Sequence, residues 1–384
     1  MNQYIRRIFV LLTLSTILSP AFLGAQPVVS MEDSPLFVAD QSTHQFKIRI
    51  DGLSKLFAFS IQLSYDASAI SLVTAVSSNF LATSGAGTAQ LMDLNTSGKI
   101  IVDEAILGVS PETTSNGVLF SVFFNAVQPG VAKEVPITFD VCYLRDEMNV
   151  PIQCATDDGL IYLYHSLLSV KAILDGPYNA SNGTMSTDLR LWDFSAQRQS
   201  PYSQDQLNYG EQLPTNVVDW ILVQVRSGQT GAIVHSKSAF IRNDGVIVYP
   251  SASANKPLPI PYTPSNNSYH VIVRHRNHLD IQSAGAVTVG YSSPTTPYDM
   301  TSSSNVYASG SASVRTRASG EVTMWPGDGS GNGLVTASDR NIVWRQNNGL
   351  IEYNVADYNM NGIVSASDAN ITWRIGNGYI SQVP

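Results

Sequence analysis

The sequence predicts a mainly β protein, and three observations indicate this fold class. Apolar and polar residues alternate in many short segments, which is the pattern of strands with one buried face. Gly, Pro, Asn and Asp turn signals separate these segments, and long segments with helical spacing are scarce. Hydrophobic residues make up 43% of the chain and charged residues 14%, a composition typical of domains with a hydrophobic core. The length of 384 residues suits two or three domains.

The N-terminus has the features of a secretory signal peptide. Arg6 and Arg7 precede a short apolar run at 8–18, and small residues end at Ala25. The apolar run is too short for a bilayer, which takes roughly 20 residues to cross. We therefore expect residues 1–25 to be removed and the mature protein to be secreted, at the cell surface or extracellular, with no membrane span.

The chain is acidic, with a formal net charge of −8. Binding to the phosphates of nucleic acid depends on clustered Lys and Arg side chains, and the sequence contains no such cluster. The charge is compatible with cation binding or with solubility alone, so no nucleic-acid partner is expected.

Residues 28–164 are expected to form a β-sandwich. Phe57, Phe59 and Ile61 alternate with polar or small residues up to Tyr65, as strand residues do. Further strands are expected at 46–50, 99–102, 117–127, 135–142 and 160–164. Short strands separated by turn signals are typical of an antiparallel sandwich.

The order of these segments resembles a cohesin domain. The strand that ends in Tyr65-Asp66, the segment Gly117–Phe124 and the segment Asp158–Ile161 are similar to strands of that family. Carbohydrate-binding modules share the same jelly-roll sandwich, so both families remain open. The first resemblance implies a module that binds dockerins, and the second implies polysaccharide binding.

The two cysteines flank a polar turn at 145–149. In an exported chain, Cys142 and Cys154 are placed to close a small hairpin with a disulfide, although two free thiols also fit the sequence. No nearby His completes a metal site or an activated thiol.

Residues 168–315 are expected to form a second β-rich, sandwich-like domain of unknown role. Strands are expected at 217–225, 232–234, 245–249 and 269–276. Segments 217–223 and 274–279 resemble parts of secreted, largely uncharacterised proteins of Bacteroidetes-type bacteria, which often end in dockerin-like repeats. The Ser, Thr, Gly and Ala residues of 298–320 suggest a linker or a frayed edge.

Two clusters in this second block could suggest chemistry. His275 and His278 have a metal-like spacing, but a strand points His270 and His275 to opposite faces and no carboxylate motif accompanies them. Asp219 next to Trp220 inside a strand is more typical of packing than of a sugar platform. We therefore expect neither a metal site nor a catalytic site here.

The strongest signal is a duplication within residues 321–384. A twelve-residue segment that begins at Asp328 recurs 29 residues later at Asp357, and each copy leads into Asn, Ile, Trp and Arg. Calcium loops place oxygen ligands at positions 1, 3, 5, 7, 9 and 12 and Gly at position 6. The first copy offers Asp328, Ser330, Asn332, the Leu334 carbonyl, Thr336 and Asp339. The second offers Asp357, Asn359, Asn361, the Ile363 carbonyl, Ser365 and Asp368.

These residues predict two Ca²⁺ sites. Because each loop has only two carboxylates, we expect weak binding, with a Kd of about 10⁻⁴ to 10⁻³ M. Two Asn-Gly turns that bind no metal are the alternative. Pro326-Gly327 before the first loop does not suit a helix, so a loop followed by a helix is expected instead of a full EF-hand.

A duplicated loop–helix unit resembles a type I dockerin. Ser330, Asn332 and Asn361 depart from the Asn and Asp usual in that family. The resemblance implies that partner-binding residues lie in two near-equivalent faces, Ala337, Ser338 and Arg345 in one and Ala366, Ser367 and Arg374 in the other.

These features together predict a secreted, non-catalytic modular protein. We expect calcium-dependent docking between dockerin-like and cohesin-like modules, other copies of this chain included, in an extracellular assembly. The alternative is a carbohydrate-binding accessory protein in polysaccharide catabolism. A glycoside hydrolase needs two carboxylates about 5–10 Å apart in a cleft. The adjacent pairs Asp103-Glu104 and Asp157-Asp158 point to opposite strand faces, so no enzyme is expected.

Overall fold

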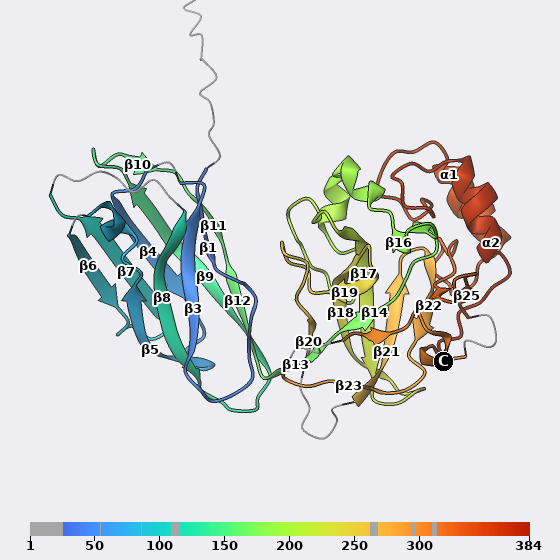
Figure 1. The fold of residues 1–384 in the computed structure, drawn as a ribbon, viewed down its shortest axis with the longest axis horizontal. Helices are drawn as coiled ribbons and strands as arrows, with labels where there is room; N and C mark the ends of the chain where they lie inside the picture. Colours follow the sequence, from blue (N-terminus) through green and yellow to red (C-terminus); the bar gives the residue numbers. More distant parts are fainter. Residues whose placement is uncertain are drawn as a thin grey trace, which may run out of the picture.

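A computed structural model describes residues 26–53, 55–85, 87–108, 116–261, 268–292, 296–308 and 313–384. The expected signal peptide, residues 1–25, lies outside the described residues. The chain forms two lobes, an N-terminal sandwich and a second lobe that holds the middle and C-terminal elements together (Figure 1). Within the described ranges, no helix is long and apolar enough to cross a membrane.

The N-terminal lobe consists of two facing sheets. One has the order β11 (Ala155–Asp157), β1 (Val28–Met31), β3 (His44–Asp51), β8 (Gly117–Ala126), β5 (Ile70–Ser77). The other has the order β2 (Leu36–Val38), β12 (Gly159–Leu163), β9 (Lys133–Arg145), β4 (Ala58–Ser64), β7 (Lys99–Ile106), β6 (Thr88–Asp93), with β10 (Pro151–Ile152) paired to β9. A short 3₁₀ turn, η1 (Leu81–Ser84), leads into β6.

Strand alternation puts the apolar residues between these sheets. Phe59, Ile61 and Leu63 of β4 are buried against Phe120 and Val122 of β8 in one core. Since successive strand residues face opposite sides, the residues between them lie on the outer face of the sheet. The β-sandwich expected from the sequence is therefore present, and several strands are longer than the apolar runs that indicated them.

The second lobe is organised around one large sheet. Its order is β22 (His278–Gln282), β21 (Ser268–His275), β17 (Val217–Arg226), β18 (Ile233–Arg242), β19 (Val246–Val248), β14 (Val170–Lys171), β24 (Tyr298–Asp299), with β23 (Val287–Thr288) paired to β21. Smaller ribbons are β13 (His165–Leu168) with β20 (Leu258–Pro261), β15 (Tyr178–Asn179) with β16 (Thr184–Met185), and β25 (Arg315–Thr316) with β26 (Val322–Thr323). The 3₁₀ turns are η2 (Asp188–Trp192), η3 (Ser195–Arg198) and η4 (Ser303–Asn305).

Every residue of β17 is buried, so both faces of this sheet are covered. Ile221 and Val223 face one core, whereas Trp220 packs with Phe240 on the other side. The sandwich-like pair of sheets expected for residues 168–315 is thus replaced, among the described strands, by one central sheet with small ribbons.

The C-terminal repeats pack against this lobe. The first helical segment comprises η6 (Asp339–Trp344) and α1 (Arg345–Asn347), and the second comprises η7 (Asp368–Trp373) and α2 (Arg374–Gly376). These two segments lie side by side at the outer end of the second lobe (Figure 1).

The prediction of a linker or frayed edge at 298–320 is wrong for the described part of this segment, which belongs to the folded second lobe. In its described part, β24 joins the large sheet and Val314 is buried in the core. The expected boundary between residues 315 and 321 falls inside the β25–β26 hairpin, where Arg315 pairs with Thr323. Ser- and Thr-rich composition suggested a linker, but these small side chains fit here at the edge of a folded domain.

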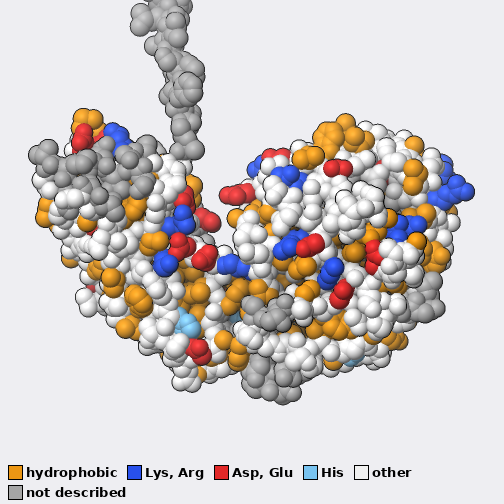
Figure 2. Space-filling view, in the orientation of Figure 1, with side chains coloured by type: hydrophobic (Ala, Val, Ile, Leu, Met, Phe, Trp, Pro, Cys, Tyr) orange, Lys and Arg blue, Asp and Glu red, His pale blue; other side chains and the backbone are white. Residues whose placement is uncertain are grey.

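The junction between the two lobes is short and buried. β12 ends at Leu163 and β13 begins at His165, with Tyr164 in the left-handed backbone conformation. Lys256 of the second lobe donates to the carbonyl of Pro35 at 2.8 Å. A hollow separates the lobes above this junction (Figure 2), and its lining includes several carboxylates, among them Glu32, Asp157 and Glu211.

Candidate metal centre and docking surface

The two duplicated loops adopt the same backbone conformation. Gly333 and Gly362, both at position 6, have φ values of 78° and 84°. Position 4 is also left-handed, with Gly331 at 68° and Met360 at 60°. Such φ values allow the tight turn that brings the oxygen-bearing positions toward one point.

In the first loop, two carboxylates accept the backbone N–H groups. Asp328 Oδ1 accepts from Asn332 N at 3.1 Å, and Asp328 Oδ2 accepts from Gly333 N at 2.9 Å. Asp339 accepts from Ser330 N at 3.0 Å and from Thr336 N at 2.8 Å. The first and last residues of the loop therefore fold the segment around one centre.

The second loop repeats this pattern bond for bond. Asp357 accepts from Asn361 N at 3.1 Å and Gly362 N at 2.8 Å. Asp368 accepts from Asn359 N at 3.0 Å and Ser365 N at 2.8 Å. Eight matching bonds in two segments of different sequence indicate that the spacing of the polar residues, and not one local contact, sets the loop shape.

All four carboxylates are buried. Burial raises the pKa of Asp357 to about 6, with Asp368 adding to this effect and Arg276 opposing it. Burial also raises the pKa of Asp328 and that of Asp368. Two buried carboxylates close together are unfavourable as anions, so a bound cation would stabilise each loop.

The donor set in each loop is suited to a hard cation. It combines two carboxylates with amide, hydroxyl and backbone carbonyl oxygens, which Ca²⁺ prefers and which softer metals do not. No cluster of three or more His, Cys, Asp or Glu side chains suited to a metal occurs in the described part of the chain. Each loop holds two such side chains, so its other candidate ligands are amide, hydroxyl and backbone carbonyl oxygens.

The two repeats also exchange contacts across a pseudo-twofold axis. Trp344 of the first helix donates through Nε1 to the Ser365 carbonyl of the second loop at 2.8 Å. Trp373 donates to the Thr336 carbonyl of the first loop at 3.0 Å. Both carbonyls belong to position 9, so each helix fixes the ligand-bearing end of the other loop.

The predicted partner-binding residues have two different environments. Ala337, Ala366, Arg345 and Arg374 are exposed on the helices. The hydroxyls of Ser338 and Ser367 instead pair with the hydroxyls of Thr336 and Ser365 inside their own loops. Ile342 and Ile371 are 59% and 66% exposed at equivalent positions and were not predicted. Ile342 precedes Arg345, and Ile371 precedes Arg374, by three residues in the same helical segment.

A buried polar network, which the sequence did not reveal, anchors the second loop to the large sheet. Asp219 is fully buried and accepts from Arg276 Nε at 2.9 Å, Tyr353 OH at 2.7 Å and its neighbour Trp220 N at 2.8 Å. His275 Nε2 lies 3.2 Å from the same carboxylate. Burial would raise the pKa of Asp219, but Arg276, His275 and Tyr353 together hold it at about 2.

The histidines of this region are structural. His275 Nδ1 and His278 Nδ1 lie 3.0 Å apart, and His278 Nε2 accepts from Gly176 N at 3.1 Å. Burial lowers the pKa of both rings. Their ring nitrogens are thus occupied by neighbouring protein groups, an arrangement that does not suit a metal ligand.

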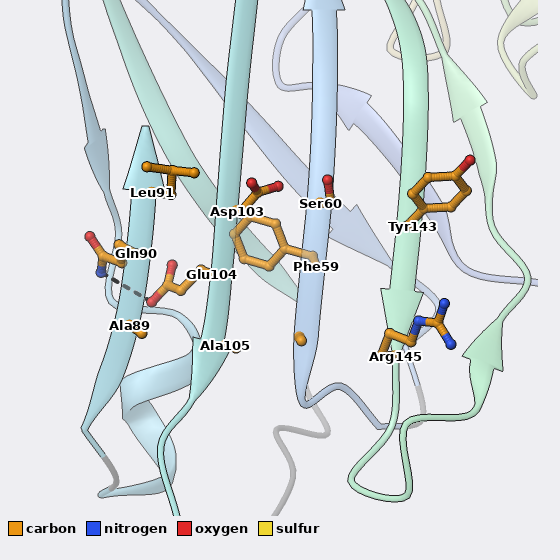
Figure 3. Close-up of a pocket in the computed structure, with 11 residues that line it drawn as sticks. Phe59, Ser60, Ala89, Gln90, Leu91, Asp103, Glu104, Ala105, Tyr143 and Arg145 are labelled. Atoms are coloured by element: carbon orange, nitrogen blue, oxygen red, sulfur yellow. Dashed lines mark hydrogen bonds between the residues drawn. The ribbon is translucent and has the colours of Figure 1, made fainter. Parts of the chain in front are cut away.

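A second candidate surface is the outer face of the sheet β6–β7–β4–β9. Register places Leu91, Asp103, Ser60 and Tyr143 in one row across these four strands, and Figure 3 shows this row. Leu91 and Tyr143 are 61% and 65% exposed at its two ends. The lining of this open hollow, about 550 Å³, also includes Ala58, Ala89, Ala105 and Arg145.

Small residues between two large exposed ones make this face flat and partly apolar. Asp103 points outward on it, whereas Glu104 is buried on the inner face and accepts from Ser77 Oγ at 2.9 Å. The two neighbouring carboxylates thus lie on opposite sides of β7, as the strand period dictates.

A disulfide joins Cys142 and Cys154 next to this face. It links β9, which carries Tyr143, to the segment before β11. Asp146 organises the intervening turn by accepting from Met148 N at 3.0 Å and Val150 N at 2.8 Å. The edge of the outer face is therefore fixed by a covalent bond.

No protein-family model matches the chain, and a search of curated proteins finds no match. Solved structures of cohesin domains resemble the chain over 36% of its length. A cohesin from a type I cohesin–dockerin complex of Clostridium thermocellum is 15% identical, with 93% of that chain covered and a TM-score of 0.31. A non-cellulosomal cohesin from Archaeoglobus fulgidus is also 15% identical, with 91% covered and a TM-score of 0.31.

A cohesin from Clostridium acetobutylicum is 18% identical, with 90% of that chain covered and a TM-score of 0.30. Scores this low carry no functional conclusion. The function proposed below therefore rests on the residues of this chain.

Proposed function

We propose that this protein is a non-catalytic, secreted docking protein whose C-terminal loops each bind one Ca²⁺. The observation that carries the proposal is the repeated hydrogen-bond pattern around two buried carboxylates in each loop. An isolated Asn-Gly turn does not require two buried acidic residues at positions 1 and 12. The alternative of two turns that bind nothing is therefore less well supported.

In this proposal the ligands are the two sets of oxygens expected from the sequence. Calcium supplies the positive charge that the buried carboxylates lack, and it links the start of each loop to the first turn of the following helix. Magnesium suits the loops less well, because it demands a tight octahedron and retains its waters. The amide oxygens of Asn332 and Asn361 each accept a backbone N–H and keep a second lone pair for a ligand role.

The helices would then present a docking surface. The first helix offers exposed Ile342 and Arg345, and the second offers exposed Ile371 and Arg374, so each carries an apolar side chain and a cation. The outer face of the sandwich offers the complement, with Leu91 and Tyr143 as apolar contacts and Asp103 as an anion.

We propose a cohesin-like module as the partner, a second copy of this chain included. Contact between the helices of one copy and the sandwich of another is heterologous, so it would build open chains. The dockerin-like tail and the cohesin-like sandwich in one sequence are the reason to consider this arrangement.

Calcium binding is tested on residues 26–384 by isothermal titration in chelator-treated buffer. We expect two binding events and a rise in melting temperature that follows ln(1 + [Ca²⁺]/Kd). The double variant Asp328→Ala with Asp357→Ala should lose both effects. Asp244→Ala, which removes a half-buried carboxylate from the turn between β18 and β19, is the control. Equal melting temperatures in calcium and in chelator would reject the proposal.

Docking is tested by sedimentation velocity of the same chain. We expect larger species in calcium than in chelator, and Tyr143→Ala or Leu91→Asp should reduce them. Val73→Asp changes an exposed apolar residue on the opposite sheet and is the control. A monomer under all conditions would exclude self-docking, and binding to an immobilised cohesin would then test a foreign partner.

Polysaccharide binding, the alternative from the sequence, remains a separate prediction. Pull-down on insoluble glucan and chitin tests it directly. Retention on either polymer that does not depend on calcium would favour it.

A further inference from the structure

The two loops match in sequence pattern and backbone shape, but they have different surroundings. The clearest difference is at position 4. In the first loop Gly331 occupies this position and a Cβ there would meet nothing within 4 Å. In the second loop Met360 occupies it, with its side chain fully buried in the main core of the second lobe.

Met360 has a backbone φ of 60°, a conformation that residues with a side chain avoid. Burial of the methionine side chain in the core explains why this residue is nevertheless tolerated there. The second loop is therefore attached at position 4 to the core of the second lobe, and the first loop is not.

The two loops also differ in their contacts at position 6. A Cβ on Gly362 would lie 2.2 Å from the ring of Trp192, which closes over the loop from the turn η2. Trp192 Nε1 also donates to the Asn361 carbonyl at 2.8 Å. At the equivalent Gly333 of the first loop, the nearest atom is Ser381 Cβ at 3.7 Å.

The start of the second loop is held in the same way. Asn277 Nδ2, in the buried turn between β21 and β22, donates to the Asp357 carbonyl at 2.8 Å and to the Val355 carbonyl at 3.1 Å. Gly176 lies so close to the Tyr358 carbonyl that a Cβ there would be 1.9 Å from the oxygen. Three separate segments of the middle region thus contact one loop.

The first loop contacts the middle region only around its two ends. Gly327 N, just before the loop, donates to the Asn277 carbonyl at 2.9 Å, and Val335 at position 8 packs in one cluster with Leu279 of β22. Its central turn is backed by the end of the described chain. Ser381 N donates to the Gly333 carbonyl at 2.9 Å, and Val335 N donates to the Tyr379 carbonyl at 3.0 Å. Within the described residues, positions 4 to 6 of this loop make no contact with the large sheet comparable to those of Met360 and Trp192.

We infer that the middle region clamps the second loop in its metal-ready shape without metal, whereas the first loop acquires that shape on binding calcium. The second part of this inference, that calcium orders the first loop, rests on the proposed function. It makes the two repeats unequal, so the near-equivalent faces expected from the sequence differ in their dependence on the ion. The calcium-responsive docking face is then the helix that follows the first loop.

Hydrogen exchange of residues 26–384, followed by mass spectrometry, tests this inference. The amides of Asn332 and Gly333 bond to Asp328 as those of Asn361 and Gly362 bond to Asp357, at almost equal distances. In chelator we expect the second-loop amides to exchange at least tenfold more slowly than their first-loop counterparts. Calcium should slow the first-loop amides tenfold or more and leave the second-loop rates within about twofold.

Two variants test the clamp itself. Met360→Gly gives the second loop the residue of the first, and Trp192→Phe removes the indole donor while it keeps a ring. Each should speed second-loop exchange in chelator. We expect about tenfold for Trp192→Phe from the loss of one hydrogen bond, and tenfold or more for Met360→Gly from the loss of a buried side chain. Leu191→Ala, at the exposed neighbour of Trp192, is the control and should change neither loop.

Equal exchange of the two loops in chelator would overturn the inference, and so would calcium slowing both by the same factor. The chelator comparison contains no calcium, so it decides the clamp by itself. An absence of any calcium effect on either loop would instead reject the proposed function.

Discussion

The buried carboxylate of Asp219 allows a quantitative test of how the repeats are held. Four hydrogen-bond donors converge on it, from Arg276, His275, Tyr353 and the N–H of Trp220, and none of its surface is exposed. A carboxylate only accepts hydrogen bonds, which suits this site, whereas an amide would turn its NH₂ group toward a donor. The substitution Asp219→Asn therefore keeps the volume and removes both the charge and one acceptor.

The expected magnitude follows from the burial of the pair. A pKa lowered to about 2 corresponds to a net preference for the charged form of about 2 kcal/mol. The variant also leaves the Arg276 guanidinium buried without its anion, and breaking a buried pair in this way costs about 3–5 kcal/mol. We therefore expect Asp219→Asn to lower the unfolding free energy by about 3–5 kcal/mol. Arg276 also donates to the Asn354 carbonyl just before the second loop, so calcium affinity should fall as well.

Urea unfolding of residues 26–384, monitored by tryptophan fluorescence and by calorimetry, measures this effect. Because the chain has several domains, the transition of the second lobe must be followed separately from that of the sandwich. The control is Asp244→Asn, which weakens a partly exposed pair with Arg242 and should cost about 1 kcal/mol or less. If Asp219→Asn were as mild as this control, the buried pair would not be what holds the repeats to the sheet.

Three further predictions concern the loops, the strand β18 and the sandwich. Trp344→Phe and Trp373→Phe each remove one hydrogen bond between the repeats and should each lower the unfolding free energy of the repeats by about 1 kcal/mol. Urea midpoints measure this loss, and unchanged midpoints would contradict the stabilising role of these bonds. Burial, with Lys237 adding to it, lowers the pKa of His235 to about 4, so its neutral form contributes stability above pH 6.5 that is lost as pH falls toward 4. His235→Gln should therefore lose less melting temperature than the wild type between pH 6.5 and 4, and parallel profiles would contradict this. Replacing Cys142 and Cys154 by Ser opens a short covalent loop and should lower the unfolding free energy of the sandwich by about 3 kcal/mol. The urea transition of the sandwich measures this loss, and an unchanged transition would contradict it.

The alternation of apolar residues and the spacing of oxygen-bearing residues predicted much of the local structure. The period of two in segments such as Phe57–Tyr65 predicted both the strand β4 and its buried face, because a strand must turn every second residue to the core. The spacing of oxygen-bearing residues predicted the shape of the two loops, because Gly at position 6 and Asp at positions 1 and 12 act within a dozen residues. Whether the loops bind calcium remains a prediction.

Residues far apart in the sequence were less predictable. Asp219 and Trp220 gave no sign that the carboxylate would meet Tyr353, because that contact joins segments 134 residues apart. The polar composition of 298–320 suggested a linker, since composition does not show whether small side chains face solvent or a neighbouring strand. Nothing in the sequence indicated that Met360 would be buried in the core of the second lobe.

The sequence by itself determined the mainly β class, the strands of the sandwich and the shape of the duplicated loops, because all of these depend on residues close together in the chain. Only the tertiary structure decided that the repeats form one body with the middle sheet, through Asp219, Arg276 and Met360. Two nearly identical loops acquired unequal surroundings in this way. The physical reason is that burial and charge pairing depend on which distant segments meet, and local patterns do not contain that information.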